Sequence, residues 1–261
     1  MNSILLDIVK AKKDILEKRK KIFPVSKLEK KASGVNKSIS FKKAIEKKDR
    51  INIIAEIKKA TPVYGVIKED FDPIKIVKDY EAGGACAVSV LTEEKYFLGN
   101  LDNLSAVKTN TSLPVLRKDF IFDEYQLYEA KAYGADAVLL ISALSDNQKL
   151  KNMIELAKKI KLDALVEIHD EGEIDKVLNC GAEIIGINSR NLNDFKVDLS
   201  IVAKIYPKIP KDKIVVAESG IRTPSDIKKL LSFGINTFLI GNTLMTSTNI
   251  KETLEDLRGI K

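Results

Sequence analysis

Short apolar runs alternate with amphipathic segments along most of the chain. From residue 52 onward the apolar runs are rich in β-branched residues, and each is followed by a segment with helical spacing of its apolar positions. We expect eight strands, at residues 53–57, 85–91, 114–116, 135–141, 162–168, 183–187, 214–217 and 236–240. We expect the alternating helices at residues 73–81, 101–109, 123–133, 146–159, 171–178, 199–205, 224–232 and 249–257.

This alternation predicts a parallel sheet whose faces are covered by helices. Eight such units in about 210 residues are typical of a closed (β/α)₈, or TIM, barrel. A glycine precedes every even-numbered strand, where the preceding helix should end, and these glycines recur about every 50 residues, at Gly84, Gly134, Gly181 and Gly234. The alternative is an open doubly wound sheet, which predicts a glycine-rich dinucleotide loop after the first strand. No such loop follows Ile57.

The first part of the chain has a different pattern. Residues 3–22 carry an imperfect helical stripe of apolar residues among lysines, which needs a surface to dock on. Turn-forming residues follow at Phe23-Pro24 and around residues 33–34, and Ser40 is placed to cap a second short helix that ends near Lys47. We therefore expect a helical extension over residues 1–45, packed on a catalytic barrel over residues 46–261.

The amino-acid composition limits the classes of molecule that the protein is expected to bind. The chain is 44% hydrophobic and 31% charged, as in soluble globular proteins. Its net charge is +7, but the lysines are scattered and arginine occurs six times, so we expect no nucleic-acid partner and instead an anionic small molecule. Cys86 and Cys180 lack metal-ligand spacing and fit reduced core thiols of a cytoplasmic protein. We find no signal peptide or long apolar run, and expect a monomer with no membrane partner, metal or cofactor.

Polar residues stand where the expected strands end. In a closed barrel, chemistry takes place where the carboxyl ends of the strands meet the following loops. These ends carry Glu56 and Lys58 on the first strand, Lys118 on the third, Glu167 on the fifth, Asn188 and Arg190 at the sixth, and Glu218-Ser219-Gly220 at the seventh. A single charged residue at the rim of a barrel is as often part of a structural ion pair as it is part of a functional site. Two lysines and two glutamates that converge on one rim favour acid–base catalysis.

Lys118 ends the short apolar run that begins at Pro114. Alternate side chains of a strand share a face, so a core position for Leu116 places Lys118 at the rim of the bowl. We expect partial desolvation there to lower the pKa of the Lys118 amine and to suit it to proton transfer. Taken alone, the run also fits an edge strand with a solvated tip.

The last two units carry glycine-containing turns, at Ser219-Gly220 and Gly241-Asn242. Barrels commonly hold a phosphate after their seventh and eighth strands, on backbone N–H groups and the start of a short extra helix. Phe97 and Phe120 fit either an apolar wall for an aromatic ring or ordinary core packing. His169 is the single histidine, and we interpret it as a surface hydrogen-bonding residue outside the site.

Several motifs occur together over the whole chain, at residues 54–62, 70–73, 91–93, 96–97, 114–120, 166–169, 186–192 and 217–221. In combination they resemble the indole-3-glycerol phosphate synthase family, which also has an N-terminal helical extension. The resemblance implies a cytoplasmic lyase of tryptophan biosynthesis. Its substrate would be 1-(2-carboxyphenylamino)-1-deoxyribulose 5-phosphate, which closes to indole-3-glycerol phosphate with loss of carbon dioxide and water.

The resemblance also implies roles for individual residues. Lys118 matches the general acid, Lys58 the group that holds the carboxylate and serves in the dehydration, and Glu167 the general base, with Glu56 as an alternative base. The remaining matches are Asn188 and Ser219 for orientation, Arg190 near the sugar phosphate, and Thr61, Gly220, Gly241 and Asn242 for the phosphate.

The chain departs from the family pattern in a few places, among them Thr61 in place of serine and Val63-Tyr64 in the first loop. Alternatives are another phosphate-binding barrel enzyme, such as phosphoribosylanthranilate isomerase, or a non-catalytic barrel that binds ligands.

Overall fold

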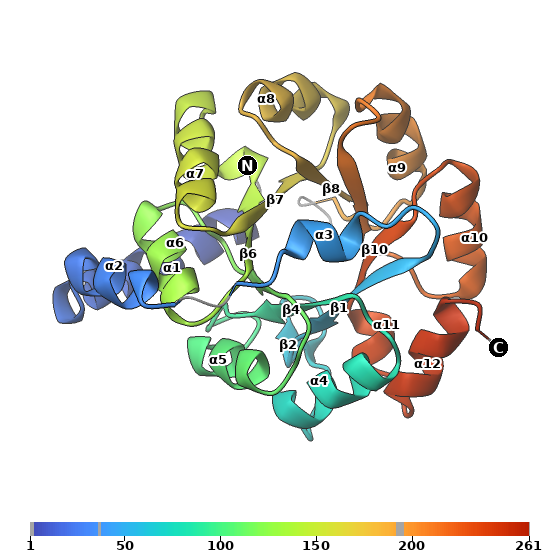
Figure 1. Cartoon of the computed structure of the whole chain (residues 1–261), viewed down its shortest axis with the longest axis horizontal. Coiled ribbons are helices and arrows are strands. Elements are labelled where there is room, and N and C mark those ends of the chain that lie inside the picture. The colour runs from blue at the N-terminus through green and yellow to red at the C-terminus, as the bar shows by residue number, and fades with distance from the viewer. Residues whose placement is uncertain (1–2, 36–37, 192–195, 261) are drawn as a thin grey trace.

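Eight parallel strands close into a barrel in this computed structural model, which describes residues 3–35, 38–191 and 196–260 (Figure 1). Around the ring the order is β1, β10, β9, β8, β7, β6, β5 and β4. Their bounds are β1 Asn52–Ile57, β4 Ala87–Leu91, β5 Val115–Lys118, β6 Ala137–Ile141, β7 Asp163–Ile168, β8 Ile184–Asn188, β9 Ile214–Glu218 and β10 Thr237–Ile240. The predicted (β/α)₈ barrel is confirmed, and each of its eight strands lies within two residues of the expected bounds.

An outer layer of helices surrounds the barrel. It consists of α4 Pro73–Ala82, α5 Leu101–Thr109, α6 Glu124–Ala132, α7 Asn147–Lys159, α8 Ile174–Asn179, α9 Ser200–Ile205, α10 Pro224–Ser232 and α12 Ile250–Leu257. The helix expected at residues 171–178 begins as a 3₁₀ turn, η2 Glu171–Glu173, before α8. Two further 3₁₀ turns are η1 Ser142–Leu144 and η3 Tyr206–Lys208. The largest apolar cluster lies between this layer and the outward-facing strand residues.

The glycines predicted to end helices all have positive φ angles. The values are 80° at Gly84, 90° at Gly134, 84° at Gly181 and 98° at Gly234. A residue with a Cβ atom is strained in this left-handed region, so glycine ends each helix at little cost and turns the chain toward the next strand. The structure thus confirms the physical basis of the repeat seen every two units.

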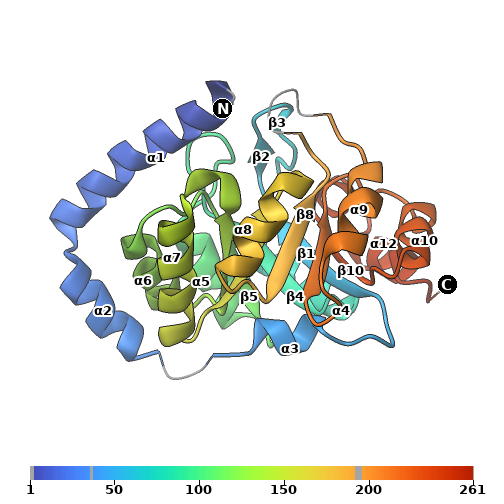
Figure 2. The same ribbon diagram turned by 90° about the horizontal axis from the view of Figure 1, so that it is seen from above.

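The N-terminal residues form three helices, α1 Ser3–Ile22, α2 Val25–Ser33 and α3 Phe41–Ile45. Helix α2 was not predicted, because the turn-forming residues at Phe23-Pro24 and around residues 33–34 indicate a break in helical structure. Pro24 is instead the N-cap of α2, and Leu28 packs with Leu16 of α1 against Phe122 and Tyr125 beside α6. Figure 2 shows α1 at one end of the barrel and α3 at the other.

Helix α3 closes the amino-terminal end of the barrel. Ser40 caps it by accepting a hydrogen bond from the backbone N–H of Lys43, as expected, although the helix ends at Ile45 and not near Lys47. Phe41 and Ile45 are fully buried and belong to the cluster that fills the barrel interior, together with Ile54 and Leu116. The chain before β1 therefore supplies part of the barrel core.

We expect Ile45→Val to lower the free energy of unfolding by about 1 kcal/mol, the usual cost of one buried methylene. Ile54→Val, inside the barrel, is the matched control and should cost a similar amount. Chemical denaturation measures this change, provided that the slope of the unfolding free energy against denaturant concentration is the same in both proteins. An Ile45→Val variant as stable as the wild type would mean that α3 does not fold with the barrel.

A short hairpin, β2 Ala60–Thr61 with β3 Gly65–Val66, follows β1 and was not predicted. In Figure 2 it lies at the same end as α1, above the carboxyl ends of the strands. The Thr61 hydroxyl oxygen accepts a hydrogen bond from the backbone N–H of Tyr64 at 3.1 Å, which shapes the turn. Among the described residues, no helix combines the length and apolar character needed to cross a membrane.

Candidate active site

A cavity opens at the carboxyl ends of the strands, and every residue predicted for the site lines it. The structure brings together Glu56, Lys58, Thr61, Phe97, Lys118, Phe120, Glu167, Asn188, Arg190, Ser219, Gly220, Gly241 and Asn242. These residues come from seven of the eight barrel strands or the loops that follow them. The bowl expected from strand ends alone is therefore present, and it also includes Glu218.

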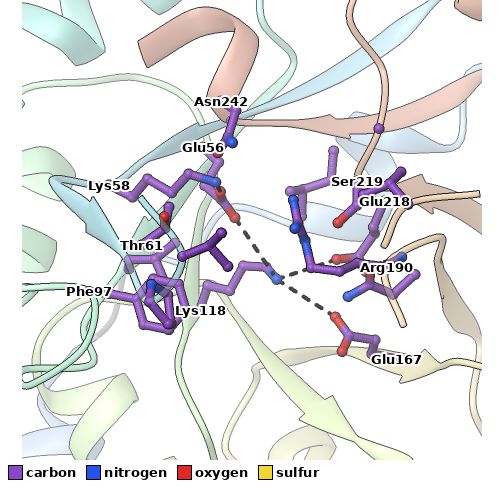
Figure 3. A pocket seen from close by; sticks show the side chains of 18 of the residues that line it. Glu56, Lys58, Thr61, Phe97, Lys118, Glu167, Arg190, Glu218, Ser219 and Asn242 are labelled. Atoms are coloured by element: carbon purple, nitrogen blue, oxygen red, sulfur yellow. Dashed lines mark hydrogen bonds and ion pairs between the residues drawn. The ribbon is translucent and has the colours of Figure 1, made fainter. Parts of the chain in front are cut away.

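Lys118 stands at the centre of this cavity (Figure 3). Its Nζ atom lies 3.4 Å from Glu218, 3.6 Å from Glu167 and 3.9 Å from Glu56, one carboxylate on each of three other strands. Leu116 lies in the barrel core, so the predicted placement of Lys118 on the same face at the rim is correct. The interpretation of this strand as an edge with a solvated tip is wrong.

The expected direction of the Lys118 pKa shift is wrong. Burial alone favours the neutral amine, but Glu218, Glu167 and Glu56 outweigh it and raise the pKa of Lys118 well above its ordinary value. Lys118 is therefore a stable ammonium before substrate binds. The residues next to Lys118 in the sequence could not predict the raised pKa, because all three carboxylates come from other strands.

Glu56 and Lys58 form a second ion pair, 2.5 Å apart, on the rim of β1. Burial favours the protonated acid, but Lys58 and Lys118 outweigh it and lower the pKa of Glu56. Gly241, after β10, approaches this pair so closely that a Cβ atom there would overlap the Glu56 carboxylate and crowd the Lys58 ammonium. Glycine at position 241 therefore makes room for the pair.

Glu218 was noted at the end of its strand but not assigned to the site. Its carboxyl group is almost fully buried and sits where a Cβ atom of residue 186 would be, which only Gly186 permits. Burial and the nearby Glu167 raise the pKa of Glu218 to about 8, while Lys118 opposes the shift. Glu167 shows the opposite effect, because Lys118 and His169 overcome its burial and lower its pKa to about 2.

Glu167 and Glu218 therefore titrate as a pair, and the contacts of Glu167 with Lys118 and His169 favour Glu218 as the group that keeps a proton. The position of Glu218 in the sequence could have predicted its place in the site, because Glu218 is the last residue of β9 and Glu167 lies in the corresponding place near the end of β7.

We expect Glu218→Gln to remove a loss of kcat/KM above about pH 8 that the wild type shows. Ionisation of Glu218 adds negative charge to a site for an anionic substrate. Because the folded-state pKa is raised, the wild type also loses stability as pH rises from the unfolded-state value toward 8, so the variant should be more stable at pH 8. A pH profile and thermal unfolding at two pH values check both. If the kcat/KM of Glu218→Gln fell above pH 8 as it does in the wild type, Glu218 would not be the group that titrates there.

The walls of the cavity are apolar on one side. The rings of Phe97 and Phe120 lie 6.2 Å apart at 39°, and Ile8 of α1 also lines the cavity. Tyr64, at the tip of the hairpin, lines the cavity while 63% exposed. The cavity therefore has two aromatic rings on one side and the charged cluster on the other.

The opposite corner of the cavity has unusual backbone geometry. Ser219 has a φ of 67° and Gly220 a φ of 81°, so a non-glycine residue adopts the left-handed conformation at the end of β9. Such strain is typical of functional sites, where the surrounding structure enforces it. Asn188 accepts the backbone N–H of Arg190 on its Oδ1 atom at 3.0 Å, which ties the loop after β8 to this corner.

Buried ion pairs fasten α1 beside Lys118. The Nζ atom of Lys12 lies 2.8 Å from Asp119 and 2.6 Å from Glu94, and only 1% of Lys12 is exposed. Asp119 also pairs with the fully buried Arg117 at 3.0 Å. This network was not predicted, because the lysines of α1 resemble those of a solvated helix surface.

The closed barrel and the lysine–carboxylate cluster at the carboxyl ends of its strands define an acid–base enzyme of the (β/α)₈-barrel class. The model of the family described as indole-3-glycerol phosphate synthase matches residues 5–257. The chain belongs to the indole-3-glycerol phosphate synthase family.

Curated relatives with that same description cover nearly the whole chain. One from Aliarcobacter butzleri is 46% identical, over 96% of this chain and 97% of its own length. Another, from Campylobacter fetus, is 45% identical over 98% of this chain and 99% of its own length. A 3-hexulose-6-phosphate synthase structure superposes with a TM-score of 0.64 at 14% identity, over 80% of this chain and 99% of its own, and shows the fold alone. The relatives favour the family over the other barrel enzymes considered.

Proposed function

We propose that this protein catalyses the ring closure of 1-(2-carboxyphenylamino)-1-deoxyribulose 5-phosphate to indole-3-glycerol phosphate, with loss of carbon dioxide and water. One observation carries the assignment of its site: the Lys118 ammonium stands among three carboxylates, with a second lysine, Lys58, in the same cavity. The reaction needs a proton donor for a ketone oxygen, a cation for a carboxylate and a base for the final proton. These side chains supply all of them.

In the first step, the aromatic carbon that bears the carboxylate attacks the substrate's ketone carbon. Lys118 gives a proton to the ketone oxygen as the carbon–carbon bond forms. A raised pKa does not prevent this transfer, because the developing alkoxide is a stronger base than an amine. Lys58 holds the carboxylate through ring closure, and loss of carbon dioxide then returns the bonding electrons to the aromatic ring.

In the second step, the new hydroxyl group leaves as water and a proton leaves the adjacent carbon. Lys58 donates to the departing hydroxyl, and Glu167 accepts the carbon-bound proton. Once Lys118 has given up its proton, it no longer lowers the pKa of Glu167, so the carboxylate becomes a stronger base when it is needed. Glu56, 3.9 Å from Lys118, is the alternative base.

The remaining candidates bind and orient the substrate. Gly220, Gly241 and Asn242 at the ends of β9 and β10, with Thr61, hold the phosphate, and Arg190 lies near it. Asn188 and Ser219 orient the sugar and the charged side chains. Phe97 and Phe120 contact the anthranilate ring. The shared position of these residues around one cavity supports these roles.

We further propose a cytoplasmic monomer, divided into a helical extension at residues 1–45 and a catalytic barrel at residues 46–261. Two buried cysteines without a disulfide are consistent with a reducing compartment. The cavity draws both its lysines and its carboxylates from a single chain.

The test is to incubate the purified protein with the carboxyphenylamino ribulose phosphate and to follow indole fluorescence. We expect a fluorescence increase that depends on enzyme concentration, with one carbon dioxide released per indole formed. No increase above that of a heat-denatured sample would refute the proposed function.

A further inference from the structure

His169 lies one residue beyond the end of β7, next to Glu167. Its side chain is only 13% exposed, and the residue is not among the described residues that line the cavity. The interpretation of His169 as a surface residue is therefore wrong. It is a buried imidazole behind the proposed general base, and the mechanism above makes no use of it.

The two oxygens of Glu167 face different basic side chains. Oε2 lies 3.6 Å from the Lys118 ammonium, on the cavity side. Oε1 lies 3.2 Å from Nε2 of His169, on the far side. A carboxylate held at one oxygen by a fixed partner presents its other oxygen in a defined direction, which is what a general base requires.

A second carboxylate lies on the other side of the imidazole and binds the backbone of His169. Glu173, in η2, accepts the backbone N–H of His169 on Oε2 at 2.8 Å, and the same oxygen lies 4.0 Å from Nδ1 of His169. Burial disfavours the charged ring, but Glu167 and then Glu173 raise the pKa of His169, with Lys118 acting weakly against them. Glu173, His169 and Glu167 thus form a row that ends at the reacting centre.

We propose that His169 is a positioning residue, which lies between Glu173 and Glu167 and aims the second oxygen of Glu167 at the substrate. This inference rests on the proposed function, because it requires Glu167 to act as the base. The proposal gives Glu173 of η2 a part in the proton transfer, although no described residue of η2 lines the cavity.

His169 is the single histidine of the chain, so NMR of tag-free protein gives one imidazole signal to titrate. We expect an apparent pKa above the ordinary value of about 6.5. Glu167→Gln should lower that pKa, and Glu173→Gln should lower it less. Glu171→Gln is the matched control on the same turn, since Glu171 pairs with Lys208 at the surface, and it should leave the titration unchanged. A wild-type value at or below 6.5 that Glu167→Gln does not move would overturn the proposal.

Kinetics test the positioning role itself. We expect His169→Ala to lower kcat about tenfold or more, with KM within threefold, because a misdirected base slows the chemical step more than binding. His169→Gln keeps a donor for Oε1 and should recover part of the loss. A kcat for His169→Ala within twofold of the wild type would overturn the positioning role alone. A wild-type protein without ring-closing activity would refute the proposed function, while the titration would still decide whether the row exists.

Discussion

Lys118→Met is expected to abolish ring closure while the barrel remains folded. Methionine keeps most of the length of the lysine side chain but has no proton to give. General acid–base groups contribute about 10²- to 10⁴-fold to rate, and Lys118 also neutralises the carboxylates around it, so we expect a loss of kcat near the upper end of that range. Steady-state fluorescence kinetics measure the change.

The control for this variant is Lys158→Met, in which an 81% exposed lysine on α7 is replaced far from the cavity mouth. It should retain wild-type kinetics. Circular dichroism should show the same helix and strand content in both variants. If Lys118→Met kept more than a tenth of the wild-type turnover, Lys118 would not be the general acid.

Glu167→Gln is expected to lower kcat by about 10²-fold or more and to leave KM nearly unchanged. Glutamine has almost the same shape and retains a contact with Lys118, but it cannot accept the proton that leaves the carbon atom. Because binding of the anionic substrate depends mainly on the phosphate site and the lysines, the loss should fall on the rate constant. Single-turnover experiments that separate binding from chemistry measure this directly.

Glu56→Gln, measured in parallel, distinguishes the two candidate bases. A smaller loss of kcat in Glu56→Gln than in Glu167→Gln supports Glu167. Unchanged kinetics in Glu167→Gln together with a large loss in Glu56→Gln would transfer the role to Glu56, which also contacts both lysines.

The charges of the cavity suggest why three carboxylates surround one ammonium. With Glu218 protonated, the ammonium groups of Lys58 and Lys118 balance the carboxylates of Glu56 and Glu167. The anionic substrate then meets a cluster that is locally neutral and contains fixed donors. This preorganised arrangement stabilises developing charge without reorganisation during the reaction.

One departure from the family pattern has a structural counterpart. Thr61 accepts the backbone N–H of Tyr64 and so takes part in the turn of the β2–β3 hairpin. The exposed Tyr64 ring lies at the edge of the cavity. Because most of this ring is exposed to solvent, we expect the effect of the change to fall on the entrance to the site.

By itself, the sequence determined the order of strands and helices, the closed barrel and the thirteen residues now found around one cavity. Hydrophobic periodicity and helix-ending glycines are local signals, and closure of a parallel sheet brings all strand ends to one rim. Only the tertiary structure decided how the groups at that rim act on one another. The raised pKa values of Lys118 and Glu218, the burial of most of the His169 side chain and the unpredicted helix α2 all depend on contacts between residues distant in the chain. Electrostatic energy and packing follow distance in space, which local sequence patterns do not encode.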